Sequence, residues 1–180
     1  MPAFAAWRFV DAVDGFEVLY PGHRQLRGCT SAVEDGRAYA VRYEITLDER
    51  WRTREVRVSN DTAAGTRSVA LSSDGAGHWT VDGAPAPHLE GFVDVDLEAS
   101  ACTNTLPIHR LDLPDDEVVT APAVYVRALD LSVTRLEQTY RRRGDGTFDY
   151  TSGDGAFRAV LRYDAAGLVV DYPGIAVRFA

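Results

Sequence analysis

The feature that most constrains this chain is a strict alternation of apolar and polar residues within short segments. In the clearest case the apolar residues Tyr39, Val41, Tyr43, Ile45 and Leu47 are each separated by one small or polar residue. Successive side chains of a strand point to opposite faces of a sheet, so a period of two predicts a strand with one buried face.

Similar segments recur along the whole chain, with Asp-Gly pairs such as Asp74-Gly75, Asp82-Gly83 and Asp154-Gly155 between them. These pairs are typical of hairpin turns, because they tolerate positive φ. No segment has sustained helical periodicity, although residues 99–103 or 105–110 are compatible with a short helix. Further strands are predicted near residues 16–20, 54–58, 68–72, 79–81, 93–97, 124–127, 131–141, 147–151, 156–163, 168–171 and 176–179.

We therefore predict an all-β, mainly antiparallel fold of about a dozen strands with at most short helices. A barrel of about eight strands is just filled by its own side chains. A larger sheet must flatten, be plugged or leave a cavity, so we expect an open or incomplete β-barrel or a strongly curved sheet. The segment 131–141 mixes polar and apolar residues on each face. The same mixing occurs at residues 52–58, where Arg52 and Arg54 share a face with Val56 and Val58. Such strands either line a groove with a polar mouth or end in solvent.

Length and charge narrow the class of protein. The 180 residues, 1–180, contain no linker or repeat and fit a single domain. No apolar run approaches the roughly 20 residues of a membrane helix, so stable membrane insertion is not expected. The N-terminal residues show no basic leader followed by an apolar stretch, which predicts a cytoplasmic protein.

The chain carries 27 acidic and 19 basic residues, a net charge of −8, which argues against nucleic acid as a partner. Every basic residue is arginine, and guanidinium groups suit contacts with carboxylates, phosphates or paired sugar hydroxyls; codon bias is the alternative explanation.

Common catalytic and metal-binding motifs are not found. The four histidines form neither HxH nor HExxH, and Cys29 and Cys102 are too far apart for a metal-binding pair. There is no nucleophile elbow and no phosphate-binding glycine loop. We therefore expect no metal and no cofactor.

The most informative stretch runs from Val93 to Leu111. Asp94 and Asp96 alternate with apolar residues, which predicts a short strand with both carboxylates on one face. A polar loop at residues 100–105 follows, and Leu106-Pro107 predicts extended chain before a strand-like pattern at residues 108–113.

This stretch resembles the signature of a bacterial family described as putative glycolipid-binding proteins, in which Asp-Val-Asp-Leu is followed by Thr-Asn-Thr-Leu-Pro-Ile-Arg-Arg-Leu. The resemblance extends over nearly the whole chain and departs from the signature at Ala101-Cys102 and at His109. Its other parts are Gly28, residues 43–54, Gly77-His78-Trp79 before Asp82-Gly83, Gln138-Thr139-Tyr140, Phe148-Asp149-Tyr150 and residues 167–173.

The resemblance implies a non-enzymatic protein that binds an amphiphilic small molecule, a glycolipid, in a groove or cavity of the sheet. The expected ligand-binding residues are Asp94, Asp96, Thr103, Asn104, Thr105, His109, Arg110, Arg54 and Tyr140. Two alternatives remain open. One is a hydrolase or isomerase of a small polar substrate that uses Asp94, Asp96 and His109, and the other is a protein-interaction module. A long apolar tunnel would favour the glycolipid-binding protein, and a compact polar pocket near His109 would favour the enzyme. A filled interior would favour the protein-interaction module.

Overall fold

A single large sheet dominates the computed structural model, which describes residues 1–11 and 13–180. Its fourteen strands lie in the order β10 (Val118–Thr120), β13 (Gln138–Arg142), β14 (Thr147–Ser152), β15 (Phe157–Tyr163), β16 (Val169–Tyr172), β17 (Ala176–Arg178), β1 (Ala5–Phe9), β2 (Val13–Gly22), β3 (Gln25–Glu34), β4 (Arg37–Leu47), β5 (Thr53–Thr62), β6 (Gly65–Ser73), β7 (Trp79–Val81) and β8 (Ala84–Pro85). All neighbouring strands in it are antiparallel, and β8 and β10 are its edges, so the sheet is not closed into a barrel.

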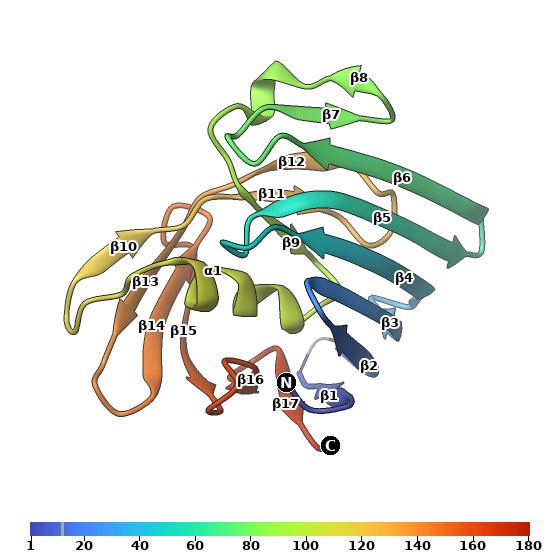
Figure 1. Ribbon diagram of the computed structural model, residues 1–180. Coiled ribbons are helices and arrows are strands. Elements are labelled where there is room, and N and C mark those ends of the chain that lie inside the picture. The colour runs from blue at the N-terminus through green and yellow to red at the C-terminus, as the bar shows by residue number, and fades with distance from the viewer. Residues whose placement is uncertain (12) are drawn as a thin grey trace.

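A second sheet of three strands lies on the concave side of the first. It contains β12 (Val133–Leu136), β11 (Ala123–Val126) and β9 (Asp94–Leu97), and β9 runs parallel to β11. The described residues also contain one α-helix, α1 (Thr105–Arg110), and two 3₁₀ turns, η1 (Pro87–Leu89) and η2 (Cys102–Asn104). In Figure 1, α1 and β9 lie between the wing formed by β2–β6 and the wing formed by β13–β15. The predicted all-β, open and strongly curved sheet is thereby confirmed.

Hydrogen bonds attach the small sheet to the inner face of the large one. The Thr53 amide donates to the Val93 carbonyl (3.0 Å), and the buried Asn60 side chain donates to the Ala128 carbonyl (2.7 Å). Thr30 Oγ1 donates to the Ala99 carbonyl (2.5 Å). Since β9 is covered on both faces, all four of its residues are buried, including both aspartates.

The alternation rule holds in β4 and fails in β2. All five apolar residues predicted to be buried in β4 are at most 6% exposed. In β2, however, Phe16 and Tyr20 point outward and are 48% and 52% exposed, whereas Glu17 and Leu19 are fully buried. The convex face of this strand is therefore more aromatic than its core face.

Two predictions from the sequence need correction. Residues 108–110 of the strand expected at 108–113 are instead the C-terminal half of α1, which confirms the alternative of a short helix at residues 105–110, and residues 111–113 form neither a strand nor a helix. Pro107 lies in the first turn, where its missing N–H needs no intrahelical partner, so it does not break the helix. The single strand expected at residues 131–141 is interrupted at Glu137, because β12 belongs to the small sheet and β13 to the large one.

The only α-helix in the described ranges has six residues, and no helix there is long and apolar enough to cross a membrane. Within the same ranges, no group of histidine, cysteine or acidic side chains is arranged to hold a metal ion. Both cysteines are free thiols.

Candidate functional site

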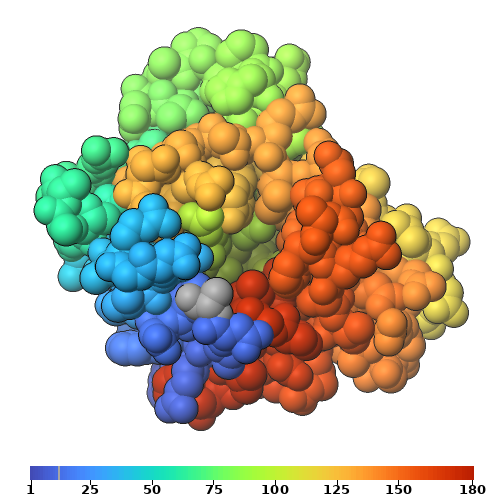
Figure 2. All heavy atoms as spheres, turned by 180° about the vertical axis from the view of Figure 1, so that it is seen from behind, coloured from blue at the N-terminus to red at the C-terminus, as the bar shows by residue number. Residues whose placement is uncertain are grey.

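A cavity of about 270 Å³ opens between the small sheet, the loop after β9 and strands β14–β16. We call it the central cavity. Figure 2 looks into this hollow: the segment around β9 and α1, in yellow-green to olive, is recessed between β11–β12, β14–β16 and the N-terminal strands. The cavity is lined by Asp96, Leu97, Glu98, Ser100, Asn104, Tyr125, Leu136, Tyr150, Ser152, Phe157, Tyr172 and Ile175.

Asp96 supplies a buried carboxylate at the cavity wall. Its Oδ1 accepts a hydrogen bond from Thr103 Oγ1 (2.6 Å), and its Oδ2 accepts one from Gln138 Nε2 (2.9 Å). Burial raises the pKa of Asp96 to about 6, although both hydrogen bonds oppose this shift. Because each carboxylate oxygen has two lone pairs, each keeps one for a ligand donor.

A hydrogen-bond chain holds this carboxylate in place. Asn104 Nδ2 donates to the Tyr140 hydroxyl (2.8 Å), which donates to Gln138 Oε1 (3.2 Å), and Gln138 in turn donates to Asp96. Tyr140 is completely buried and does not line the cavity. Of the predicted site residues, Asp96 and Asn104 therefore reach the cavity, whereas Thr103 and Tyr140 support them from behind.

A second buried network fixes the loop at the cavity wall. Glu17 is fully buried and accepts hydrogen bonds from the Tyr43 hydroxyl (2.5 Å), Ser100 Oγ (2.5 Å) and the Ala101 amide (2.7 Å). Burial raises its pKa. Gly28 makes the network possible, because a Cβ at that position would lie 2.2 Å from the Tyr43 hydroxyl oxygen.

Sequence reasoning missed Glu17. The signal was an acid flanked by Phe16 and Val18 in β2, but that pattern by itself predicts that Glu17 faces solvent.

Three aromatic side chains form the opposite wall of the cavity. The rings of Tyr150, Phe157 and Tyr172 contact one another edge to face, with centroid separations of 5.8 to 6.2 Å. Burial raises the pKa of both tyrosines, so their hydroxyls stay neutral. The cavity thus combines an anionic acceptor with an aromatic wall.

Asp94 and Arg110 form a separate ion pair outside the cavity lining. The Asp94 carboxylate is 1% exposed and accepts two hydrogen bonds from the Arg110 guanidinium, from Nε (2.8 Å) and Nη2 (2.6 Å). Burial raises the pKa of Asp94, and the guanidinium opposes this shift. The two-point geometry uses both carboxylate oxygens, as an ionised aspartate requires.

His109 is also engaged elsewhere. Its ring stacks on Trp51 with a centroid separation of 3.8 Å, and its Nε2 lies 2.9 Å from the Ala166 carbonyl. Burial lowers its pKa, which favours the neutral imidazole. The structure therefore does not bring together Asp94, Asp96 and His109, the three residues of the enzyme hypothesis.

The remaining predicted residues lie away from the cavity. Arg54 Nε donates to the Ser73 carbonyl (2.9 Å) and so holds the end of β6. Thr105 is fully buried at the start of α1, and its Oγ1 has no hydrogen-bond partner within the described part of the chain.

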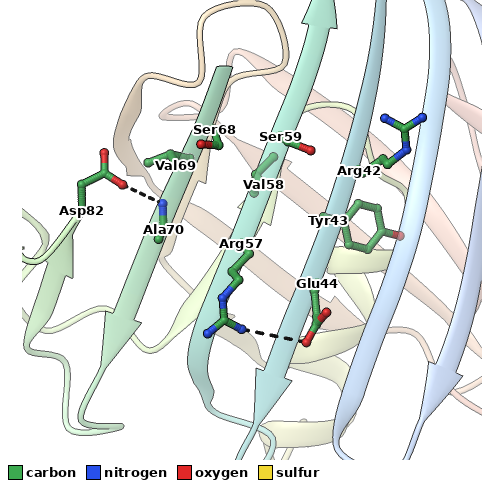
Figure 3. A pocket seen from close by; sticks show the side chains of 10 residues that line it. All are labelled: Arg42, Tyr43, Glu44, Arg57, Val58, Ser59, Ser68, Val69, Ala70 and Asp82. Carbon is green, nitrogen blue, oxygen red and sulfur yellow. Dashed lines mark hydrogen bonds and ion pairs between the residues drawn. The ribbon is translucent and has the colours of Figure 1, made fainter. Parts of the chain in front are cut away.

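A larger hollow of about 370 Å³ lies on the convex face of β4–β6 (Figure 3). Both of its arginines are already paired on the open surface: Arg42 with Asp61 (3.0 Å), and Arg57 with Glu55 (3.0 Å) and Glu44 (4.0 Å). It contains none of the predicted site residues. We therefore take the smaller central cavity, which has a buried carboxylate, as the candidate site.

The fold and the central cavity define a class of small β-proteins in which an open curved sheet encloses a polar pocket. The chain belongs to the family described as "Putative glycolipid-binding", whose sequence profile matches residues 5–178. It is also similar to a DUF1089 family protein of known crystal structure from Pseudomonas aeruginosa. The two are 33% identical, with a TM-score of 0.87 over 96% of this chain and 95% of the other. None of the curated proteins matches the chain.

Proposed function

We propose that this protein binds an amphiphilic ligand, a glycolipid, without chemical change, and that the hydroxyl-bearing headgroup occupies the central cavity. The observation that carries the proposal is the pairing of the Asp96 carboxylate with the aromatic wall of Tyr150, Phe157 and Tyr172. The family description supports the ligand class.

The chemistry of the cavity suits a sugar ring. Hydroxyl groups donate hydrogen bonds to a carboxylate, and the apolar face of a ring packs on aromatic side chains. Small-molecule pockets usually measure about 300–1,000 Å³. A cavity of about 270 Å³ is therefore sized for a headgroup alone.

In this proposal the apolar tail of the ligand lies at the mouth of the central cavity. Apolar side chains of the concave face pack into one continuous core, so we place no acyl chain among them. Leu136, Phe157 and Ile175 line the cavity and are only partly buried. We place the start of the tail along these three residues at the mouth. The hydrolase or isomerase alternative gains no support from geometry, because its three residues have separate partners.

Isothermal titration calorimetry tests this proposal by comparing n-octyl β-D-glucoside, below its critical micelle concentration, with n-octanol. The two ligands have the same tail, but n-octanol lacks the sugar. We expect one binding site and affinity for the glucoside at least about tenfold higher, equivalent to about 1.4 kcal/mol.

Ser152→Phe, which places a ring in the cavity, should abolish binding. Thr134→Phe is the matched control, because Thr134 is exposed on β12 and does not line the cavity. Absence of glucoside binding, or equal binding by the Ser152→Phe variant, would contradict the proposal.

A further inference from the structure

We infer that the central cavity selects neutral or positively charged headgroups and rejects those that carry a carboxylate or phosphate, with Asp96 and Glu98 as the selecting residues. This inference rests on the proposed function and specifies its ligand class. Among the described residues that line the cavity, two are acidic and none is arginine or histidine.

Glu98 is also held at the cavity wall. It follows β9 directly, its Oε2 accepts a hydrogen bond from the Ala128 amide (2.8 Å), and its Oε1 lies 3.3 Å from Arg127 Nη2. The Glu98 side chain is 24% exposed and that of Arg127 is 55% exposed, so the arginine lies toward solvent and the carboxylate toward the cavity.

The two arginines that lie next to the acidic residues of β9 and its loop already have carboxylate partners. Arg127 pairs with Glu98, and Arg110 is committed through two hydrogen bonds to Asp94. A bound anion would therefore lie between two carboxylates without a compensating cation. Repulsion between like charges is much stronger in such a partly buried site than in water.

A hydroxylated headgroup meets the opposite situation. Each Asp96 oxygen has used one of its two acceptor positions, so sugar hydroxyls would donate to the remaining ones. An ammonium group, as in an amino sugar, would add attraction to both carboxylates. The acidic wall thus favours one set of ligands and penalises the other, which is how specificity arises.

Two probes test this inference directly: n-octyl β-D-glucoside and n-octyl β-D-glucuronide, which differ only in a hydroxymethyl group against a carboxylate. We expect the wild-type protein at neutral pH to bind the glucoside at least about tenfold more tightly than the glucuronide. In Asp96→Asn/Glu98→Gln the preference should fall to roughly threefold or less.

The control variant Glu55→Gln/Asp61→Asn also removes two negative charges, but from the exposed convex face. It should keep the wild-type preference. If it loses the preference as the cavity variant does, net charge and not the cavity wall selects the ligand, and the inference is overturned.

The remaining outcomes separate this inference from the proposed function. If neither probe binds the wild-type protein, the proposed function fails. If both bind with equal affinity, the proposed function stands and the selection is overturned. If circular dichroism shows that Asp96→Asn/Glu98→Gln is misfolded, the single variant Glu98→Gln replaces it, because glutamine keeps an acceptor for the Ala128 amide. An unchanged preference for the glucoside in Glu98→Gln would overturn the role of Glu98.

Discussion

Three carboxyl groups in residues 1–11 and 13–180 are almost completely buried, and each has a different set of partners. Glu17 accepts three hydrogen bonds from neutral donors, Asp94 is paired with the Arg110 guanidinium, and Asp96 has two neutral donors and an open cavity beside it. Burying a charge is costly unless partners compensate for lost hydration. Asp96 is the one of the three that keeps access to a ligand.

The first prediction concerns the pH dependence of stability at Asp96. Its pKa is raised to about 6 in the folded protein from an ordinary value of 3.8, so the folded state binds the extra proton between these values. The stabilisation is therefore fully present below about pH 4 and is lost as the pH rises through about 6. The size of the shift corresponds to about 3 kcal/mol.

Urea unfolding of the wild-type protein and Asp96→Asn from about pH 4 to about pH 7 measures this effect. The free energy of unfolding of the wild-type protein, minus that of the variant, should fall by about 2 kcal/mol across this range, because the unfolded carboxyl is already partly ionised at pH 4. Glu17 and Asp94 titrate in both proteins and largely cancel. A difference that is constant with pH would show that Asp96 ionises normally.

A second residue-scale prediction separates scaffold from ligand site at Arg110. Arg110→Met removes the partner of a buried carboxylate and should destabilise the protein by about 3–5 kcal/mol. Replacing both partners, in Asp94→Leu/Arg110→Met, should recover part of this loss. The control Arg24→Met breaks an exposed pair with Glu49 and should cost about 1 kcal/mol or less.

Urea denaturation supplies these values, and glucoside titration shows whether the folded fraction still binds. If Arg110→Met is as stable as the wild-type protein but no longer binds glucoside, Arg110 belongs to the ligand site. That result would reverse its structural role.

At the scale of elements, alternation predicted strands well and their inward faces less well. It identified the buried face of β4, but in β2 it predicted only a strand, and Glu17 and Leu19, not Phe16 and Tyr20, face the core. The reason is that Glu17 is buried by partners on distant segments, which no local pattern records. Similarly, the change of sheet at Glu137 depends on how β12 and β13 pack and not on their composition.

The candidate site was only partly predictable from the sequence, because local patterns do not record contacts between distant segments. The run from Val93 to Leu111 identified Asp96 and Asn104, because two spaced carboxylates and a Thr-Asn-Thr cluster lie close together in it and match the family signature. It also included Asp94 and His109, whose partners Arg110 and Trp51 become apparent only in three dimensions. The aromatic wall comes from β14–β16: Tyr150 and Tyr172 lie in segments of the family resemblance, but nothing in those segments shows that the two rings contact each other and line a cavity with Asp96.

The third prediction concerns the close contact of β3 with the Tyr43 side chain. Gly28→Ala would place a methyl group 2.2 Å from the Tyr43 hydroxyl oxygen and 2.3 Å from its Cζ, so the ring must move away from Glu17. Overpacking of this kind costs about 1–3 kcal/mol. Gly22→Ala in the same hairpin meets no atom closer than 3.5 Å and should change stability by about 0.5 kcal/mol or less.

Thermal unfolding followed by circular dichroism compares the two variants under the same conditions. Equal melting temperatures would show that Tyr43 relocates without loss, and the proposed role of Gly28 would then be wrong.

At the scale of the whole molecule, continuous hydrogen bonding through fourteen strands predicts that residues 1–180 unfold as a single domain. Trp7 lies in β1 near the middle of the sheet and Trp79 in β7 near one edge, and both are buried. Variants that keep only Trp7 or only Trp79 of the three tryptophans report on the two regions separately.

In each variant, the urea midpoint from tryptophan fluorescence should equal the midpoint from far-ultraviolet circular dichroism. An earlier fluorescence transition for Trp79 alone would show that the β6–β8 edge unfolds independently, and the single-domain prediction would then fail.

The pairing of β1 with β17 also has a consequence for biosynthesis. Trp7 pairs with Arg178 in the sheet, and its indole nitrogen donates to the Val169 carbonyl (2.8 Å). Figure 1 shows the two ends of the chain side by side. Within residues 1–180, β1 is synthesised before the other strands and both of these partners after nearly all of them, so one edge of β1 and the Trp7 side chain stay unpaired while β2–β15 are made. Unpaired strand edges and exposed apolar surface promote aggregation. Nascent chains of this protein should therefore depend on chaperones until the last strands emerge.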